Sequence, residues 1–173
     1  MRLRGKRVAI LIEDFYQDLE VWYPILRLRE EEAKVIVIGP QKRSYKGKYG
    51  YPIEADGDEK AAKVSNFDAV VIPGGWAPDK IRLSKKLVSF VHDMDRAGKV
   101  VASICHGGWV LVSAGIVKGR TVTSYIAIKD DLVNAGAKFV DREVVRDGNL
   151  ITSRKPDDLP AFLREIIKTL RVL

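Results

Sequence analysis

Val100-Val101-Ala102-Ser103-Ile104-Cys105-His106-Gly107-Gly108 carries the strongest structural signal in this sequence. Its first five residues are typical of a strand buried on both faces, and that strand runs directly into Cys105. With two glycines just beyond, the pattern predicts a nucleophile elbow between a strand and a helix. The glycines leave room where strand and helix approach closely, and the helix amides favour a thiolate. We therefore expect Cys105 to be a functional thiol rather than a buried structural cysteine.

Strand-like and helix-like segments alternate along the rest of the chain. Continuous apolar runs with β-branched residues predict strands at 8–12, 34–39, 68–72, 99–104 and 121–123. Apolar residues at helical spacing predict helices at 19–30, 84–97, 107–114, 128–135 and 157–173. The alternation predicts a mostly parallel sheet with helices on both faces, whose sites lie at the carboxyl ends of the strands.

Local signals add detail to this plan. Asp18 is expected to cap the first helix, with a kink or a start near Pro24. Residues 41–57 are expected to form an excursion with a short hairpin. Asp147-Gly148 predicts the turn of a second hairpin, within residues 143–152.

The composition fits one domain over residues 1–173. Hydrophobic residues make up 46% and charged residues 31%, which excludes a mainly disordered chain. One cysteine excludes a disulfide scaffold, and with only two histidines neither a metal site nor a cofactor is expected. The net charge of +7 is spread along the chain, so no nucleic-acid partner is expected.

Apolar runs fall short of the roughly 20 residues that a membrane span needs. The basic N-terminus leads into a short apolar run that Glu13 and Asp14 end, which is unlike a signal peptide. We therefore expect a cytoplasmic protein with no membrane partner.

The base that would assist the thiol is less clearly marked. His106 adjoins Cys105, and because neighbours in a tight turn usually diverge, its imidazole is expected to reach the sulfur poorly. His92 is expected to face solvent, so no histidine comes from a distant loop as in a Cys-His-Asp hydrolase. Either His106 serves as the base, or the thiolate works without a histidine.

Two more segments follow predicted strands. Gly74-Gly75-Trp76-Ala77-Pro78-Asp79 exposes backbone N–H groups that, with the amide after Cys105, form a candidate oxyanion hole. Trp76 is expected to line the pocket, and Asp79 either orients a histidine or caps the next helix. In Glu13-Asp14-Phe15-Tyr16-Gln17-Asp18, a carboxylate buried near the thiol would share its proton, whereas surface acids would play no such part.

Together these segments resemble the PfpI-type intracellular cysteine protease family. That family belongs to the superfamily of the parkinsonism-associated deglycase and is similar to class I glutamine amidotransferase domains. The resemblance covers nearly the whole chain and implies a flavodoxin-like three-layer α/β sandwich. It rests on motifs that occur in order: Asp18-Leu19-Glu20, Tyr23-Pro24, Pro73-Gly74-Gly75, Ala77-Pro78, Ala102-Ser103-Ile104-Cys105-His106-Gly107, Thr123-Ser124-Tyr125, Lys129-Asp130-Asp131, Asn134-Ala135-Gly136, Asp147-Gly148-Asn149 and Ser153-Arg154.

The resemblance also implies roles for individual residues. It implies Cys105 as the nucleophile, His106 as its adjacent histidine, and the amides of Gly75 and His106 as the oxyanion hole. It implies that Asp79 completes a triad in the site of a neighbouring subunit, within homodimers or hexamers. Tyr125 matches a tyrosine that lines the site.

Three positions depart from the family pattern. Alignment on Asp18-Leu19-Glu20 puts Gln17 where the family has a Glu that hydrogen-bonds the cysteine sulfur. An amide there donates to a thiolate but holds no proton. Asp79 replaces a commoner Glu and is one methylene shorter. Trp109 stands where many relatives have Gln, and is expected to reshape the pocket floor if it points inward.

The resulting hypothesis is a cysteine-dependent hydrolase that attacks a carbonyl carbon of a peptide, a glycated protein or a small aldehyde. Peptide hydrolysis and removal of carbonyl adducts share this chemistry, so the sequence does not separate a protease from a deglycase. The alternative is a non-enzymatic stress-response redox sensor or chaperone in which Cys105 is an oxidisable thiol. Gln17 slightly favours that alternative.

Overall fold

A six-stranded sheet forms the centre of the protein, of which the computed structural model describes residues 3–172. Its strand order is β2-β1-β5-β6-β10-β9, and all neighbours pair in parallel except β9 with β10. The mostly parallel sheet predicted from the sequence is confirmed. Its strands are β1 (Arg7–Leu11), β2 (Lys34–Ile38), β5 (Ala69–Ile72), β6 (Val100–Ile104), β9 (Val144–Asp147) and β10 (Leu150–Ser153).

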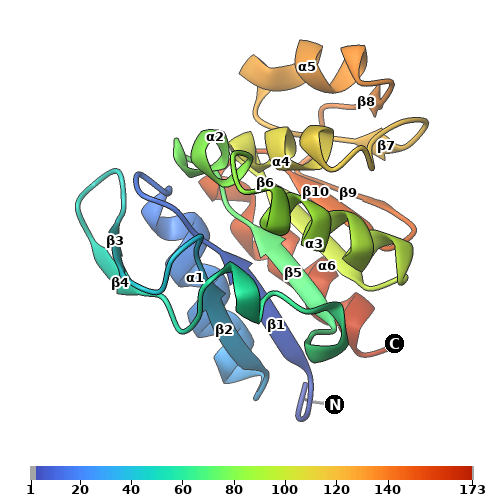
Figure 1. Ribbon diagram of the computed structural model, residues 1–173. Coiled ribbons are helices and arrows are strands. Elements are labelled where there is room, and N and C mark those ends of the chain that lie inside the picture. The colour runs from blue at the N-terminus through green and yellow to red at the C-terminus, as the bar shows by residue number, and fades with distance from the viewer. Residues whose placement is uncertain (1–2, 173) are drawn as a thin grey trace.

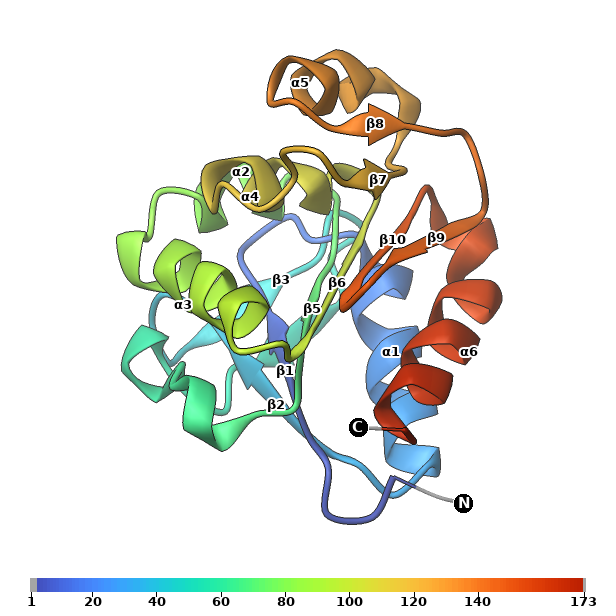
Figure 2. The same ribbon diagram turned by 90° about the vertical axis from the view of Figure 1, so that its right-hand side faces the viewer.

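Helices cover both faces of this sheet (Figures 1 and 2). One face carries α1 (Asp18–Glu30) and α6 (Leu159–Leu170), which pack against each other, and the opposite face carries α3 (Lys85–Arg96). The short helices α2 (Ala77–Ile81) and α4 (Gly108–Ser113) follow β5 and β6. This is the three-layer α/β sandwich that the sequence predicted.

Smaller elements connect the strands and helices of the central sandwich. A hairpin of β3 (Ser44–Lys46) and β4 (Pro52–Glu54) lies beyond β2, as expected for residues 41–57. A parallel pair, β7 (Thr121–Val122) and β8 (Lys138–Phe139), lies with α5 (Lys129–Asn134) beyond α4. Single turns of 3₁₀ helix occur at Glu59–Ala61, Val64–Asn66, Cys105–Gly107, Ile126–Ile128 and Pro156–Asp158.

The middle strands of the sheet lie inside the hydrophobic core. Every residue of β5 and β6 is buried, because helices cover the sheet on both faces. The inner side of α1 contributes Val21, Ile25 and Leu28 to the same core. The carboxyl ends of β5 and β6, where the site segments begin, are therefore held by close packing.

Several local predictions need correction. Gln17, not Asp18, caps α1, because its side-chain oxygen accepts the bond from the Glu20 N–H. Pro24 lies inside α1 and does not end it, since the buried face of the helix offsets one missing backbone bond. His92 is half-buried rather than solvent-facing, and its Nδ1 lies 3.0 Å from the Ala114 carbonyl oxygen. The second hairpin turns at Gly148-Asn149, one residue later than predicted.

No helix within residues 3–172 is long and apolar enough to cross a membrane.

Candidate active site

Cys105 occupies a strained turn between β6 and α4. Its φ of 60° lies in the left-handed region, which is uncommon for a residue other than glycine. The 3₁₀ turn that follows brings Gly107 so close to β5 that a Cβ there would lie 2.5 Å from the Ile72 carbonyl oxygen. The glycine after His106 is therefore a steric requirement of the elbow. This geometry matches the nucleophile elbow expected from the sequence.

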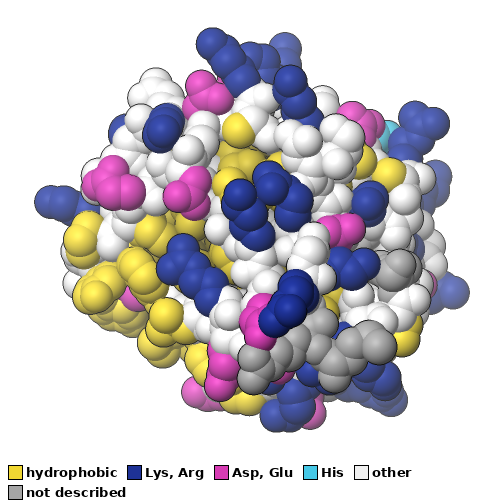
Figure 3. Space-filling model, turned by 90° about the horizontal axis from the view of Figure 1, so that it is seen from below, with side chains coloured by type: hydrophobic (Ala, Val, Ile, Leu, Met, Phe, Trp, Pro, Cys, Tyr) yellow, Lys and Arg dark blue, Asp and Glu magenta, His cyan; other side chains and the backbone are white. Residues whose placement is uncertain are grey.

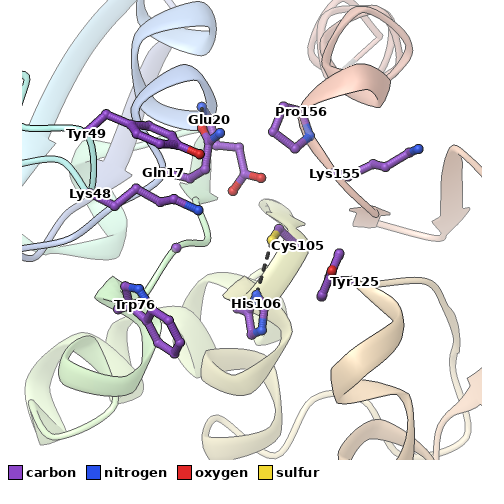
Figure 4. A pocket seen from close by; sticks show the side chains of 11 residues that line it. Gln17, Glu20, Lys48, Tyr49, Trp76, Cys105, His106, Tyr125, Lys155 and Pro156 are labelled. Atoms are coloured by element: carbon purple, nitrogen blue, oxygen red, sulfur yellow. Dashed lines mark hydrogen bonds between the residues drawn. The ribbon is translucent and has the colours of Figure 1, made fainter.

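The sulfur faces a pocket of about 300 Å³ at the carboxyl ends of the strands (Figure 4). Of the residues expected there, the structure brings together Gln17, Gly75, Trp76, Cys105, His106 and Tyr125. The sequence analysis did not assign five other lining residues, namely Glu20, Lys48, Tyr49, Lys155 and Pro156.

Glu20, rather than Gln17, is the carboxyl group that contacts the thiol. Its side chain is fully buried beside Cys105 and accepts a bond of 2.7 Å from the Gly74 N–H through one oxygen, while the other carboxyl oxygen has no hydrogen-bond partner within residues 3–172. Gln17 lines the pocket but uses its side-chain oxygen to cap α1. The alignment that placed Gln17 against the sulfur is therefore wrong. Glu20 faces inward because the helical repeat places it on the same buried face of α1 as Pro24 and Leu28.

Gly74 and Gly75 allow this close contact. A Cβ on Gly74 would lie 2.7 Å from the Glu20 carboxylate and 2.9 Å from the Cys105 sulfur. Gly75 has a φ of 75° and forms an isolated bridge with Tyr16, so the loop before α1 is tied to the loop after β5. The two loops thus hold the carboxyl group and the thiol in one place.

Glu20 and Cys105 titrate as a coupled pair. Burial raises the pKa of Glu20 to about 7. Burial, together with the charge of Glu20, raises the pKa of the Cys105 thiol to about 12, although the backbone N–H groups of His106 and Gly75 act in the opposite direction. Between these two values the pair carries one proton and one negative charge. Transfer of that proton from sulfur to carboxylate produces a thiolate without changing the net charge.

His106 reaches the sulfur, contrary to the expectation that it would diverge. Its Nδ1 lies 3.3 Å from Sγ. The ring is held from two sides, stacked on Tyr125 and edge-on to Trp109, with both ring centroids 5.1 Å away. Burial, and then the charge of Lys48, lower the pKa of His106. The imidazole is therefore neutral near pH 7 and available to accept a proton.

Trp109 and Asp79 lie outside the pocket of this chain. The indole N–H of Trp109 donates to Asp131 over 2.8 Å, so this side chain supports His106 and does not form the pocket floor. Asp79 is exposed on α2, and the next helix, α3, is capped by Ser84 instead. The capping alternative for Asp79 is therefore wrong.

Glu13 and Asp14 form ion pairs with the hairpin and do not contact the thiol. Arg43 Nη2 lies 2.9 Å from an oxygen of Asp14 and 3.2 Å from an oxygen of Glu13. These ion pairs join the loop after β1 to the β3–β4 hairpin. Within the described part of the chain, no three His, Cys, Asp or Glu side chains gather as metal ligands.

Known proteins are similar to this chain in sequence and in fold. The sequence profile of the DJ-1/PfpI family matches residues 6–169. A Pyrococcus furiosus protein named deglycase PfpI is 44% identical over 95% of this chain and 99% of its own length. An Escherichia coli protein named protein/nucleic acid deglycase 2 is 41% identical over 96% of this chain and 98% of its own. The crystal structure of Drosophila melanogaster DJ-1beta has a TM-score of 0.89 and 30% identity, covering 98% of this chain and 91% of that one.

Proposed function

The chain belongs to the DJ-1/PfpI family, and on this premise we propose a cysteine-dependent hydrolase in which Cys105 attacks a carbonyl carbon. Its substrates are peptides or the carbonyl adducts of glycated proteins and small aldehydes. The observation that carries the proposal is a strained thiol beside a buried carboxyl group in a pocket. No metal or cofactor is needed for this chemistry.

The first step forms a bond between sulfur and the carbonyl carbon. The thiol proton passes to Glu20, the thiolate attacks, and the carbonyl oxygen takes the negative charge. The backbone N–H groups of Gly75 and His106 lower the pKa of the Cys105 thiol, so they are close enough to the sulfur to stabilise that oxygen as well.

For a peptide, the second step breaks the C–N bond. The leaving amine takes the proton that Glu20 received from the thiol, and a thioester remains on Cys105. A water molecule, deprotonated by His106, then attacks the thioester, which releases the acid and restores the thiol. A carbonyl adduct undergoes the same first addition.

Assembly of the chain with itself is part of the proposal. The outer face of α1 exposes Leu19, Tyr23 and Leu26, and Tyr49 and Tyr51 of the hairpin lie exposed as well. Hydrophobic side chains gather on the left of the face shown in Figure 3, in agreement with these exposures. Such a patch suits a homodimer, or dimers stacked into a hexamer.

Asp79 would act across such an interface, against His106 of a neighbouring copy. Mixing inactive Asp79→Ala with inactive Cys105→Ala should restore part of the activity, because hybrid sites combine an intact thiol with an intact aspartate. A mixture that stays inactive, or a protein that is monomeric in light scattering at micromolar concentration, would remove Asp79 from the mechanism.

The main test compares turnover of a peptide and of a methylglyoxal adduct by the wild type, Cys105→Ala and His106→Ala. Turnover should require Cys105 with both substrates. Turnover that survives Cys105→Ala contradicts the proposal, and indifference to His106→Ala would leave a thiolate assisted by Glu20 alone.

The redox-sensor alternative is less well supported. An oxidation sensor needs an accessible thiol of low pKa, whereas burial raises the pKa of Cys105 to about 12. The feature that favoured this alternative, an amide at the thiol, is absent because Glu20 lies there. We further propose that the chain acts as one domain in the cytoplasm, a reducing compartment that suits its free cysteine.

A further inference from the structure

A single cation faces the nucleophile from the hairpin. Lys48 lines the pocket, and its side chain points inward toward Cys105 (Figure 4). The structure shows no ion pair for Lys48 within residues 3–172. Lys155, on the opposite rim, points away from the sulfur and pairs with Asp157 over 3.2 Å. Among the described residues, Lys48 is therefore the lysine of the pocket without an ion pair, and its Nζ lies 5.0 Å from the centroid of the Tyr49 ring.

The loop that carries Lys48 is firmly held. The Lys48 N–H donates to the Tyr16 carbonyl oxygen over 2.8 Å. The Asp18 carboxylate accepts bonds from the N–H groups of Tyr49 and Tyr51, at 3.1 and 3.2 Å. A side chain on Gly47 would overlap the same carboxylate. These contacts fix the backbone at position 48 relative to α1, so the exposed Lys48 side chain starts from a defined point at the edge of the pocket.

The charge of Lys48 is felt by the catalytic groups. It lowers the pKa of Glu20 and that of His106. The one carboxyl group among the lining residues is Glu20, which accepts a bond from the Gly74 N–H. Within the described part of the chain, Lys48 therefore has no carboxylate in an ion pair with it, and a substrate carboxylate can supply one.

We propose that Lys48 binds a carboxylate of the substrate, so that the site prefers small carbonyl compounds and adducts that carry a carboxylate near the reacting carbon. This substrate class rests on the proposed attack by Cys105. The carboxylate would lie toward the hairpin, and the carbonyl group between the sulfur and the N–H groups of Gly75 and His106.

The first test needs no turnover. Iodoacetate and iodoacetamide have nearly the same shape and differ by one negative charge. With either reagent the sulfur displaces iodide, which forms an S–C bond and releases the thiol proton. We expect Lys48→Met to lower the ratio of the iodoacetate rate to the iodoacetamide rate by about fivefold, the size of one partly screened ion pair. Lys48→Arg should keep the ratio.

Lys46→Met is the matched control, because Lys46 is an exposed lysine on the neighbouring strand β3. It should leave the ratio within about twofold of the wild type, since an exposed charge outside the pocket is screened. A ratio that is unchanged in Lys48→Met, or that falls equally in Lys46→Met, would overturn the assignment.

The second test concerns the substrate. The hemithioacetals of methylglyoxal with N-acetylcysteine and with N-acetylcysteine amide share one reacting group, and only the former carries a carboxylate. We expect kcat/KM to favour the former in the wild type and the preference to disappear in Lys48→Met. Equal turnover of both by the wild type refutes the carboxylate subsite but leaves the hydrolase standing. Turnover of neither, together with the alkylation preference, refutes the hydrolase while the anion site stands.

Discussion

Glu20→Gln would remove the proton carrier beside the thiol with little change in shape. The new amide oxygen can still accept the bond from Gly74, and the amide N–H can face the sulfur. The exchange of a proton with Cys105 is lost. In the wild type the pair loses its first proton near pH 7, because burial raises the pKa of Glu20 to about 7. Alkylation of Cys105 should therefore rise with a midpoint near pH 7.

The size of the effect follows from a thiol left without this partner. An ordinary thiol has a pKa of about 8.5 and is only about 3% ionised at pH 7. Burial raises the pKa of Cys105 in the variant as in the wild type, whereas the charge of Glu20, which also raises it, is removed. We expect the variant to lose the midpoint near pH 7, to label more slowly at pH 7, and to show its rise at least about 1.5 pH units higher, as for a thiol without a proton-sharing partner.

The assay is the pH dependence of iodoacetamide labelling under excess reagent. Cys105 is the single cysteine, so each label reports one site. Glu54→Gln, at an exposed position of β4, controls for loss of a negative charge and should leave the profile unchanged. Faster labelling of Glu20→Gln at pH 7 would refute the reasoning, because Glu20 would then act only as a charge that opposes the thiolate.

Three further predictions concern stability and shape. Burial raises the pKa of folded Glu20 from 4.5 to about 7, so its stabilising contribution is full below about pH 4.5 and is lost as the pH rises through 7. Glu20→Gln should remove up to about 3 kcal/mol of this pH dependence in urea unfolding at pH 5 and 8, and an unchanged dependence would contradict the burial argument. Gly74→Ala should cost about 1–3 kcal/mol and slow alkylation, because its Cβ would press on Cys105 and Glu20; a normal melting temperature would contradict this contact. Trp109→Phe should lose less than about 1 kcal/mol, the bond to Asp131, and keep turnover within a few-fold; a collapse of turnover would place the indole in the pocket.

The fold and the nucleophile could be predicted from short stretches of the sequence. The apolar runs that became β5 and β6 are buried on both faces, and such runs are visible without any knowledge of their neighbours. The position of Cys105 at the end of β6 followed from the same pattern, and the glycines after it indicated the tight turn.

The rest of the site depended on contacts between distant segments. Lys48 reaches the pocket because its hairpin is hydrogen-bonded to residues about 30 positions earlier in the chain. The Lys48 N–H donates to Tyr16, and the Tyr49 N–H donates to Asp18 over a separation of 31 positions. Glu20 was missed because alignment by linear spacing ignored the turn of α1. The buried side of the helix is visible in the spacing of Glu20 and Pro24, and attention to it would have indicated this carboxyl group.

His106 shows a different limit of local reasoning. Adjacent side chains usually diverge in a tight turn that no other part of the protein packs against. Here Tyr125 and Trp109, both from later in the chain, hold the ring against the sulfur. Packing by side chains from other elements overrode the local preference.

Cys105 and Glu20 are proposed to share one proton, so that loss of the first proton of the pair near pH 7 activates the thiol. Because the chain has one cysteine, labelling with ¹³Cβ-cysteine gives a single NMR signal from this residue. We predict a change in its chemical shift with a midpoint near pH 7 that is lost in Glu20→Gln. A signal that stays constant through pH 7 and moves only near pH 12 would show that Cys105 does not share a proton with Glu20, and would contradict this proposal.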